Sequence, residues 1–97
     1  MMMVLVTYDV STIDRAGKRR LRQVAKACCI HGQRVQNSVF ECLVPPDLWV
    51  RFRDQLIKLI DPDTDSLRFY FLGNNWKPKV EHVGAKPSTD LTGPLII

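Results

Sequence analysis

Apolar and polar residues recur along this chain with two different periods, and the change of period predicts the order of strands and helices. Residues 3–10 are apolar on both faces of a period of two, which favours a strand at the centre of a sheet. The next segment repeats its apolar positions every three or four residues, which predicts a helix that stops at Gly32. Its stripe is Leu21, Val24, Ala25 and Cys28.

The second half of the chain shows the same alternation. Residues 34–44 predict one strand, ended by Pro45 and Pro46. Asp47 is a plausible cap for a second helix, which the exit turn 61–65 follows. Its expected stripe is Leu48, Phe52, Leu56 (or Gln55) and Leu59, flanked by Trp49 and Ile60. Residues 66–73 and 79–84 predict two more strands, and the apolar tail 90–97, which contains Pro94, suits an edge strand.

This order of elements predicts an α+β, ferredoxin-like sandwich of the βαββαβ type, with an antiparallel sheet and two helices on one face. We expect a single domain over 1–97, in which 83–97 forms a C-terminal loop and edge strand. The bare sheet face favours a homodimer packed sheet to sheet, and the tail strand is expected to add to its own sheet or, preferably, to the partner's.

Charge narrows the range of partners. The 97 residues carry a net charge of +4, and half of the 14 basic residues fall between positions 15 and 34. These are Arg15, Lys18, Arg19, Arg20, Arg22, Lys26 and Arg34. Such a cluster indicates an anionic polymer as partner, although a solvated helix face kept soluble by charge is an equally common reason for one.

Cysteine usage and the N-terminus bear on the compartment. The three cysteines are an odd number, and two of them, Cys28 and Cys29, are adjacent, so a reduced, cytoplasmic setting is expected. The spacing of Cys28 and His31 suggests zinc, but a structural zinc site needs four ligands, and buried thiols are the better interpretation. The N-terminal apolar run is interrupted by Asp9, so we expect neither a signal peptide nor a membrane span.

Asp9 is the main candidate for chemistry. A carboxylate at the end of an apolar strand needs a cation, a hydrogen-bonded cage or water. One interpretation is a hard-oxygen site for Mg²⁺; the other is a turn or capping carboxylate ahead of Ser11 and Thr12. Asp14 and Glu41 do not have a metal-like spacing to Asp9, so a second carboxylate must come from symmetry.

Several segments together resemble one family. The strings "TYDVS", "RLRQVAKAC", "GQRVQNSVFECLV", "DSLRFYFLG" and "GAKPSTDLTGPLII" cover essentially the whole chain. They resemble the small universal CRISPR adaptation protein, the non-integrase partner of the spacer integrase, which is a metal-dependent endonuclease. The stretch "GNNWKPKVEHVGAKPS" is similar to the subtype that acts on double-stranded DNA.

The resemblance implies a homodimer in which Asp9 from both subunits holds Mg²⁺, with Mn²⁺ as a substitute. Asp9 and Tyr8 are its implied catalytic residues, and packing is the alternative role for Tyr8. The implied nucleic-acid contacts are Arg15, Lys18, Arg19, Arg22, Lys26, Arg34, Ser11, Ser38 and Phe40, and the basic helix leaves the register of Arg19, Arg20 and Arg22 open. Turn or strand hydrogen bonds for the two serines, and a core or interface position for Phe40, are the alternatives.

Three functions follow as hypotheses. The first is a metal-dependent endonuclease of CRISPR adaptation, acting on double-stranded DNA or single-stranded RNA, with the spacer integrase as partner. The second is a non-catalytic dimeric adaptor that bridges integrase dimers and binds protospacer DNA. The third is a ferredoxin-like regulatory module with a small ligand.

Three further residues are assigned by type and position. His82 is expected to be a strand residue, with a proton shuttle as the rarer alternative. Trp49 and Trp76 are core or interface candidates, and the loop around Trp76 could instead contact nucleic acid or the integrase.

Overall fold

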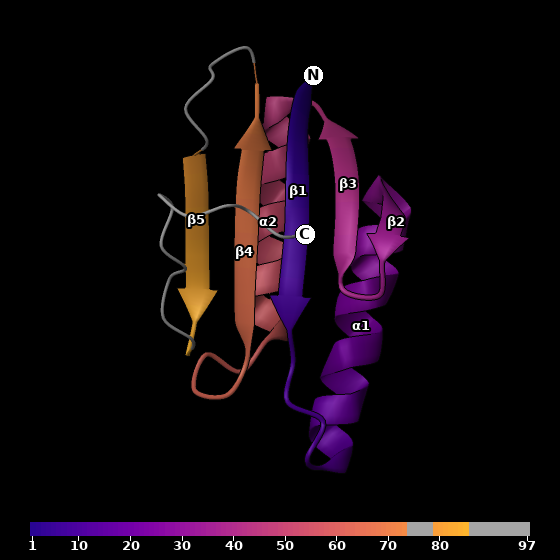
Figure 1. Ribbon diagram of the computed structural model, residues 1–97, viewed down its shortest axis with the longest axis vertical. Helices are drawn as coiled ribbons and strands as arrows, with labels where there is room; N and C mark the ends of the chain where they lie inside the picture. Colours follow the sequence, from indigo (N-terminus) through magenta and orange to yellow (C-terminus); the bar gives the residue numbers. More distant parts are fainter. Residues whose placement is uncertain (74–78, 86–97) are drawn as a thin grey trace.

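The computed structural model describes residues 1–73 and 79–85, which form one antiparallel sheet and two helices. The strands are β1 (Met2–Asp9), β2 (Gly32–Gln36), β3 (Val39–Val44), β4 (Ser66–Leu72) and β5 (Lys79–Gly84). The helices are α1 (Arg15–His31) and α2 (Pro46–Leu59). The strand order is β2-β3-β1-β4-β5, and both helices cover the same sheet face (Figure 1). This confirms the α+β, ferredoxin-like prediction, with β5 as a further strand beside β4.

The core lies between the sheet and the helices. From β1 the alternate residues Val4, Val6 and Tyr8 point into it, as expected for the most central strand. The predicted stripe of α1 packs against them, with Val24 and Cys28 fully buried. Each core side chain of this size contributes roughly 1.5–3 kcal/mol through burial, so the helix layer is held mainly by apolar contact.

Gly17 and the Asp14 side chain fix the start of α1. The Asp14 Oδ1 accepts a hydrogen bond from the Gly17 amide at 2.7 Å, which caps the helix. A Cβ on Gly17 would collide with the carbonyl oxygen of Ser11. Only glycine therefore lets the first turn of α1 approach the segment that leaves β1.

The structure corrects the single strand predicted over residues 34–44. Two strands, β2 and β3, form a hairpin there, with a turn at Asn37 and Ser38. The register of the pair shifts between Arg34 and Gln36, so Val35 is an extra residue in a bulge. The alternation of apolar and polar residues continues through the turn, so only the strand pairing reveals where the first strand ends and the second begins.

The start of α2 differs from the prediction. Pro45 occupies the capping position and makes no side-chain cap, whereas Asp47 lies inside the first turn. Trp49 lies in the core, one of its two predicted positions, with 5% exposure and edge-on contacts to Phe52, Phe69 and Phe71. Leu56 is fully buried and Gln55 exposed, which decides between these two stripe positions. The pairing of aromatic edges and faces explains the inward turn of the indole.

The cysteines are all free thiols, of which Cys28 and Cys42 are buried and Cys29 is exposed. Burial raises the pKa of Cys28 to about 12 and that of Cys42 to about 11, so both stay protonated at neutral pH. Neither helix in the described ranges has the length and hydropathy to cross a bilayer. The cytoplasmic setting stays a prediction, and the predicted tail strand and Trp76 lie outside the described residues.

Candidate functional site

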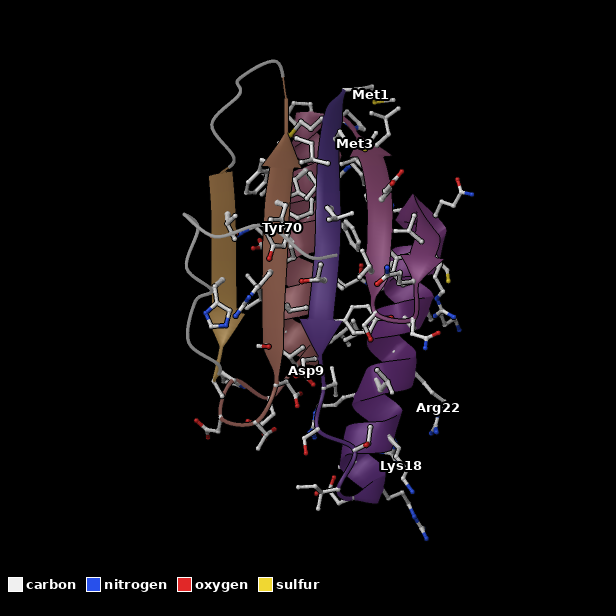
Figure 2. The ribbon with its side chains drawn as sticks, viewed as in Figure 1. Met1, Met3, Asp9, Lys18, Arg22 and Tyr70 are labelled. Atoms are coloured by element: carbon white, nitrogen blue, oxygen red, sulfur yellow. The ribbon has the colours of Figure 1, made fainter. Side chains whose placement is uncertain are left out.

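Asp9 ends β1 on the sheet face that the helices leave open. Side chains alternate along the strand, so Asp9 shares this face with Leu5 and Thr7 and not with Tyr8. Across the β1–β4 pair Asp9 lies opposite Ser66, and Thr7 lies opposite Arg68. The Asp9 side chain is exposed and lies at the end of the open face (Figure 2). The predicted strand-end carboxylate is thus accessible to a ligand.

A hollow of about 220 Å³ surrounds the end of β1. Its lining comes from Thr7, Tyr8, Asp9, Ser66 and Arg68. The lining combines one carboxylate, two small hydroxyls and one guanidinium, a set that can hold a hydrated cation and a phosphate oxygen together. Within residues 1–73 and 79–85, no group of three or more His, Cys, Asp or Glu side chains could hold a metal ion. Among the described residues, Asp9 is the one carboxylate that lines this hollow.

Arg68 and His82 form the side of this region toward β5. They are direct partners across the β4–β5 pair, so both lie on the open face. Burial and the neighbouring Arg68 lower the pKa of His82, which is therefore neutral at pH 7. Its Nε2 is buried and has no hydrogen-bond partner within the described part of the chain. The positive charge beside the hollow thus comes from Arg68.

Tyr8 lies on the opposite side of the sheet from Asp9. Its ring packs against Phe40 with centroids 6.1 Å apart, and its hydroxyl donates to the Asn37 carbonyl at 3.2 Å. Burial and the nearby Cys28 raise the pKa of Tyr8 despite the opposing effect of Arg34. Both residues line the hollow, but their side chains lie on opposite faces of the sheet, and the Tyr8 ring is packed in the core.

Phe40 is fully buried in the core, which corrects its prediction as a nucleic-acid contact. The guanidinium carbon of Arg34 lies 5.1 Å from the centroid of this ring, a cation–π distance. Arg34 is exposed on the edge strand β2. The core therefore holds Phe40, while Arg34 remains available to solvent and to an anion.

The outer face of α1 carries a basic stripe. At roughly 100° per residue, the five positions Arg15, Lys18, Arg19, Arg22 and Lys26 fall within an arc of about 100° opposite Val24. All five side chains are exposed. Lys18 and Arg22 point away from the sheet, toward the same end of the molecule as Asp9 (Figure 2). The stripe and Asp9 share one end of the molecule but belong to different layers.

Arg20 is the basic residue of α1 that turns inward. Its Nε donates to the Oδ2 of Asp65 at 2.8 Å, and Asp65 is fully buried. Arg20 is thus occupied by an ion pair, whereas Arg19 and Arg22 are exposed. Of the two predicted serines, the Ser11 amide donates to Asp65, and the Ser38 carbonyl accepts from the Tyr8 amide at 3.1 Å.

The sequence reasoning missed Arg68, Ser66 and Asp65. A signal for Arg68 was present, since Ser66, Arg68 and Tyr70 alternate with the apolar Leu67 and Phe69 and so mark the face away from the core. Nothing local marked Asp65 as buried, because acidic residues in a turn between elements are ordinarily solvated. Two of its partners, Ser11 and Arg20, lie 54 and 45 residues away in the sequence.

The fold and the site define a small ferredoxin-like protein with a strand-end carboxylate on the open sheet face and a basic first helix. The family model for CRISPR associated protein Cas2 matches residues 2–80. The chain belongs to the Cas2 family.

Curated relatives support the assignment over nearly the whole length. The chain is 62% identical over 95 residues to the CRISPR-associated endoribonuclease Cas2 3 of Rhodospirillum rubrum, covering 98% of this chain and 100% of that protein. It is 60% identical over 95 residues to the CRISPR-associated endonuclease Cas2 of Halalkalibacterium halodurans, covering 98% and 99% of the two chains.

Two solved structures share the fold. The crystal structure of Streptococcus pyogenes Cas2 at pH 6.5 superimposes with a TM-score of 0.70 and 61% identity, over 77% of this chain and 90% of that one. The hypothetical protein TT1823 from Thermus thermophilus gives a TM-score of 0.62 at 30% identity, over 80% and 98% of the two chains.

Proposed function

We propose that this protein is a metal-dependent endonuclease of CRISPR adaptation that hydrolyses phosphodiester bonds in double-stranded DNA or in single-stranded RNA. The observation that carries the proposal is the hollow in which the exposed Asp9 lies with Ser66 and Arg68. Relatives named endoribonuclease and endonuclease support a nuclease role, and only the first name specifies RNA.

The donor set fits Mg²⁺, with Mn²⁺ as a substitute. Mg²⁺ takes hard oxygen ligands, keeps several waters and needs only one or two carboxylates when a substrate phosphate supplies the rest. Asp9 is the carboxylate, and the hydroxyls of Thr7 and Ser66 are further oxygen donors of the lining. When bound, the ion supplies an activated water and charge neutralisation for the phosphodiester. A single carboxylate predicts weak binding unless a second subunit contributes its own Asp9.

Arg68 is proposed to bind and orient the phosphate that is cleaved. A guanidinium donates two parallel hydrogen bonds to phosphate oxygens and stabilises the negative charge that develops during hydrolysis. The basic stripe of α1 and Arg34 would hold the phosphates further along the strand. These contacts read charge and shape, so low sequence specificity is expected.

The open sheet face supports the predicted homodimer. The spacer integrase is the further protein partner that we propose. The half of the open face distant from Asp9 is apolar: Met3 lies opposite Leu43 on one side and Leu72 on the other (Figure 2), whereas Leu5 and Tyr70 are already buried in one chain. Leu43 and Leu72 are 54% and 47% exposed in one chain. A second copy is the occupant we propose, because an isologous contact brings the same apolar patch to both sides and pairs two Asp9-bearing halves.

The test compares wild type with Asp9→Asn in cleavage of double-stranded DNA and single-stranded RNA, with and without Mg²⁺. Wild type should cleave only with the metal, and Asp9→Asn should lose at least 100-fold of that activity while it stays folded and dimeric. Cleavage that persists in highly purified Asp9→Asn would show that Asp9 is a turn carboxylate.

The adaptor function remains the second candidate, because Asp9 is the one carboxylate among the described residues that line the hollow. In that case the dimer bridges integrase dimers and binds protospacer DNA without cutting it. Spacer integration reconstituted with Asp9→Asn separates the two functions. Full integration by the variant supports the adaptor. Loss of both integration and cleavage in the variant supports the endonuclease.

A further inference from the structure

The buried carboxylate of Asp65 holds the segment that directly follows Asp9. Asp65 ends the turn between α2 and β4 and is fully buried. Its Oδ1 accepts from the Ser11 amide at 3.0 Å and from the Thr64 hydroxyl at 3.1 Å. Its Oδ2 accepts from the Arg20 Nε at 2.8 Å and from the Asp61 amide at 2.9 Å. Both oxygens are therefore fully engaged, by groups from three separate parts of the chain.

Ser11 is fixed on both sides of its backbone. Its amide donates to Asp65, and its carbonyl oxygen lies against Gly17, where no side chain fits. Asp9, two residues earlier, lies opposite Ser66, the neighbour of Asp65. The strand end that carries Asp9 is thus held from β4 on one side and from the Asp65 carboxylate on the other.

Arg20 extends this arrangement to the helix. It projects from the inner side of α1, while Arg19 and Arg22 project outward from adjacent turns. A buried, fully hydrogen-bonded ion pair has one favourable geometry, whereas apolar contacts tolerate sliding and rotation. The pair with Asp65 therefore fixes the rotation of α1 about its axis, and with it the direction of the basic stripe.

We propose that Asp65 and Arg20 are positioning residues of the Asp9 site. They set where the Asp9 carboxylate lies and how the basic stripe is oriented relative to it. The inference rests on the proposed function, because it assigns Asp9 to the metal. A metal ligand must be held to within about half an ångström, and outer partners of metal ligands commonly affect metal affinity by 10-fold to 100-fold.

The rival explanation is that the pair only stabilises the fold, and the chain offers a matched control. Arg53 on α2 donates to both carboxylate oxygens of Glu81 on β5, each at 2.6 Å. This second ion pair joins a helix to a strand, whereas the first joins a helix to the turn before a strand. The second pair lies on the helix-covered face and holds no residue next to Asp9. Arg20→Lys and Arg53→Lys each keep the charge and lose the planar fork of the guanidinium.

The experiment titrates the full-length protein with Mn²⁺ and follows free Mn²⁺ by electron paramagnetic resonance. Amide hydrogen exchange over residues 9–13 is measured on the same samples. Arg20→Lys and Asp65→Asn should weaken Mn²⁺ binding about 10-fold or more and speed exchange in this segment. Arg53→Lys should bind Mn²⁺ within twofold of wild type and leave this exchange unchanged. Arg20→Lys keeps the experiment valid if Asp65→Asn does not fold.

Mn²⁺ binding and exchange by Arg20→Lys equal to those of wild type would overturn the positioning role, as would equal losses in Arg20→Lys and Arg53→Lys. If the wild-type protein, like Asp9→Asn, binds no Mn²⁺, the metal proposal is overturned instead. In that case exchange over residues 9–13 alone decides whether Asp65 and Arg20 order the strand end.

Discussion

Opposite charges on neighbouring strands give the hollow at the end of β1 its chemical character. Asp9 and Arg68 both line it, two positions apart in the β1–β4 register. A carboxylate alone attracts a cation and repels the substrate phosphate, whereas a guanidinium nearby attracts that phosphate. The balance of these two side chains therefore determines whether metal and substrate can bind together.

Arg68→Met should lower kcat/KM for metal-dependent cleavage by about 100-fold, because the variant loses the donors proposed for the phosphate. Its Mn²⁺ affinity should not fall, since Arg68 is not a metal ligand. Steady-state cleavage with Mn²⁺ titration measures both quantities. Arg51→Met, at an exposed position of α2, is the control. Equal activity of the two variants would remove Arg68 from the site.

Asp65 links stability to pH. Burial alone would raise the pKa of Asp65, but hydrogen bonds from Arg20 and from the Asp61 and Ser11 amides outweigh it and lower the pKa below its ordinary value. A lowered pKa means that the ionised carboxylate stabilises the folded state above the unfolded pKa of about 3.9. That contribution is lost as the pH falls through the folded pKa.

The difference in unfolding free energy between wild type and Asp65→Asn should therefore be constant from about pH 5 to pH 8 and shrink below about pH 4. Urea unfolding at pH 7, 5 and 3 measures it. The hydrogen bond from Arg53 likewise lowers the pKa of Glu81, but Glu81 is present in both proteins and cancels in the comparison. A difference that does not change with pH would show that the Asp65 charge does not contribute.

At the scale of elements, α1 has two faces with separate tasks. Its inner face supplies Val24, Ala27 and Cys28 to the core, and its outer face carries the basic stripe. Neither face constrains the other, so charge on the outer face can be changed without disturbing packing. This separation makes the substrate path testable without loss of the fold.

Arg19→Ala with Arg22→Ala should reduce the salt dependence of duplex binding. Each phosphate contact contributes about 0.9 to the slope of log K against log salt, so two lost contacts should lower the slope by about 1.8. Binding measured at several NaCl concentrations gives the slope. Arg51→Ala with Lys58→Ala removes two exposed charges from α2 and is the control. A slope unchanged in the α1 variant would place the substrate path elsewhere.

At the scale of the whole molecule, the two-layer architecture leaves one sheet face without helices. That face divides into an apolar half around Met3, Leu43 and Leu72 and a polar half around Asp9 and Arg68. Contact between two copies would bury the first half and bring the second halves together. Metal binding and dimer formation should then depend on each other.

Leu43→Glu with Leu72→Glu should raise the dimer dissociation constant by about 100-fold or more, because buried like charges cost several kcal/mol at an interface. Both side chains are about half exposed in one chain, so the monomer should stay folded. Analytical ultracentrifugation measures association, and cleavage should fall with it. Val50→Glu, at 57% exposure on α2, is the control, and a variant that dimerises like wild type would move the interface off this face.

The sequence by itself determined the elements and the exposed chemistry of this protein. The period-two and helical patterns gave β1, α1, α2, β4 and β5, because side-chain periodicity is a local property. The same periodicity separated the basic stripe of α1 from its core side. Asp9 was identifiable because a charge at the end of an apolar strand is costly unless something holds it.

The tertiary structure decided every feature that depends on pairing across the fold. Strand pairing split residues 34–44 into a hairpin and brought Arg68 to the hollow. It also buried Asp65 against Arg20, partners 45 residues apart in the chain. Local patterns indicate which face of the sheet a residue lies on. Only the order of the strands decides which residues of different strands are neighbours on that face, because strand order depends on contacts between distant segments.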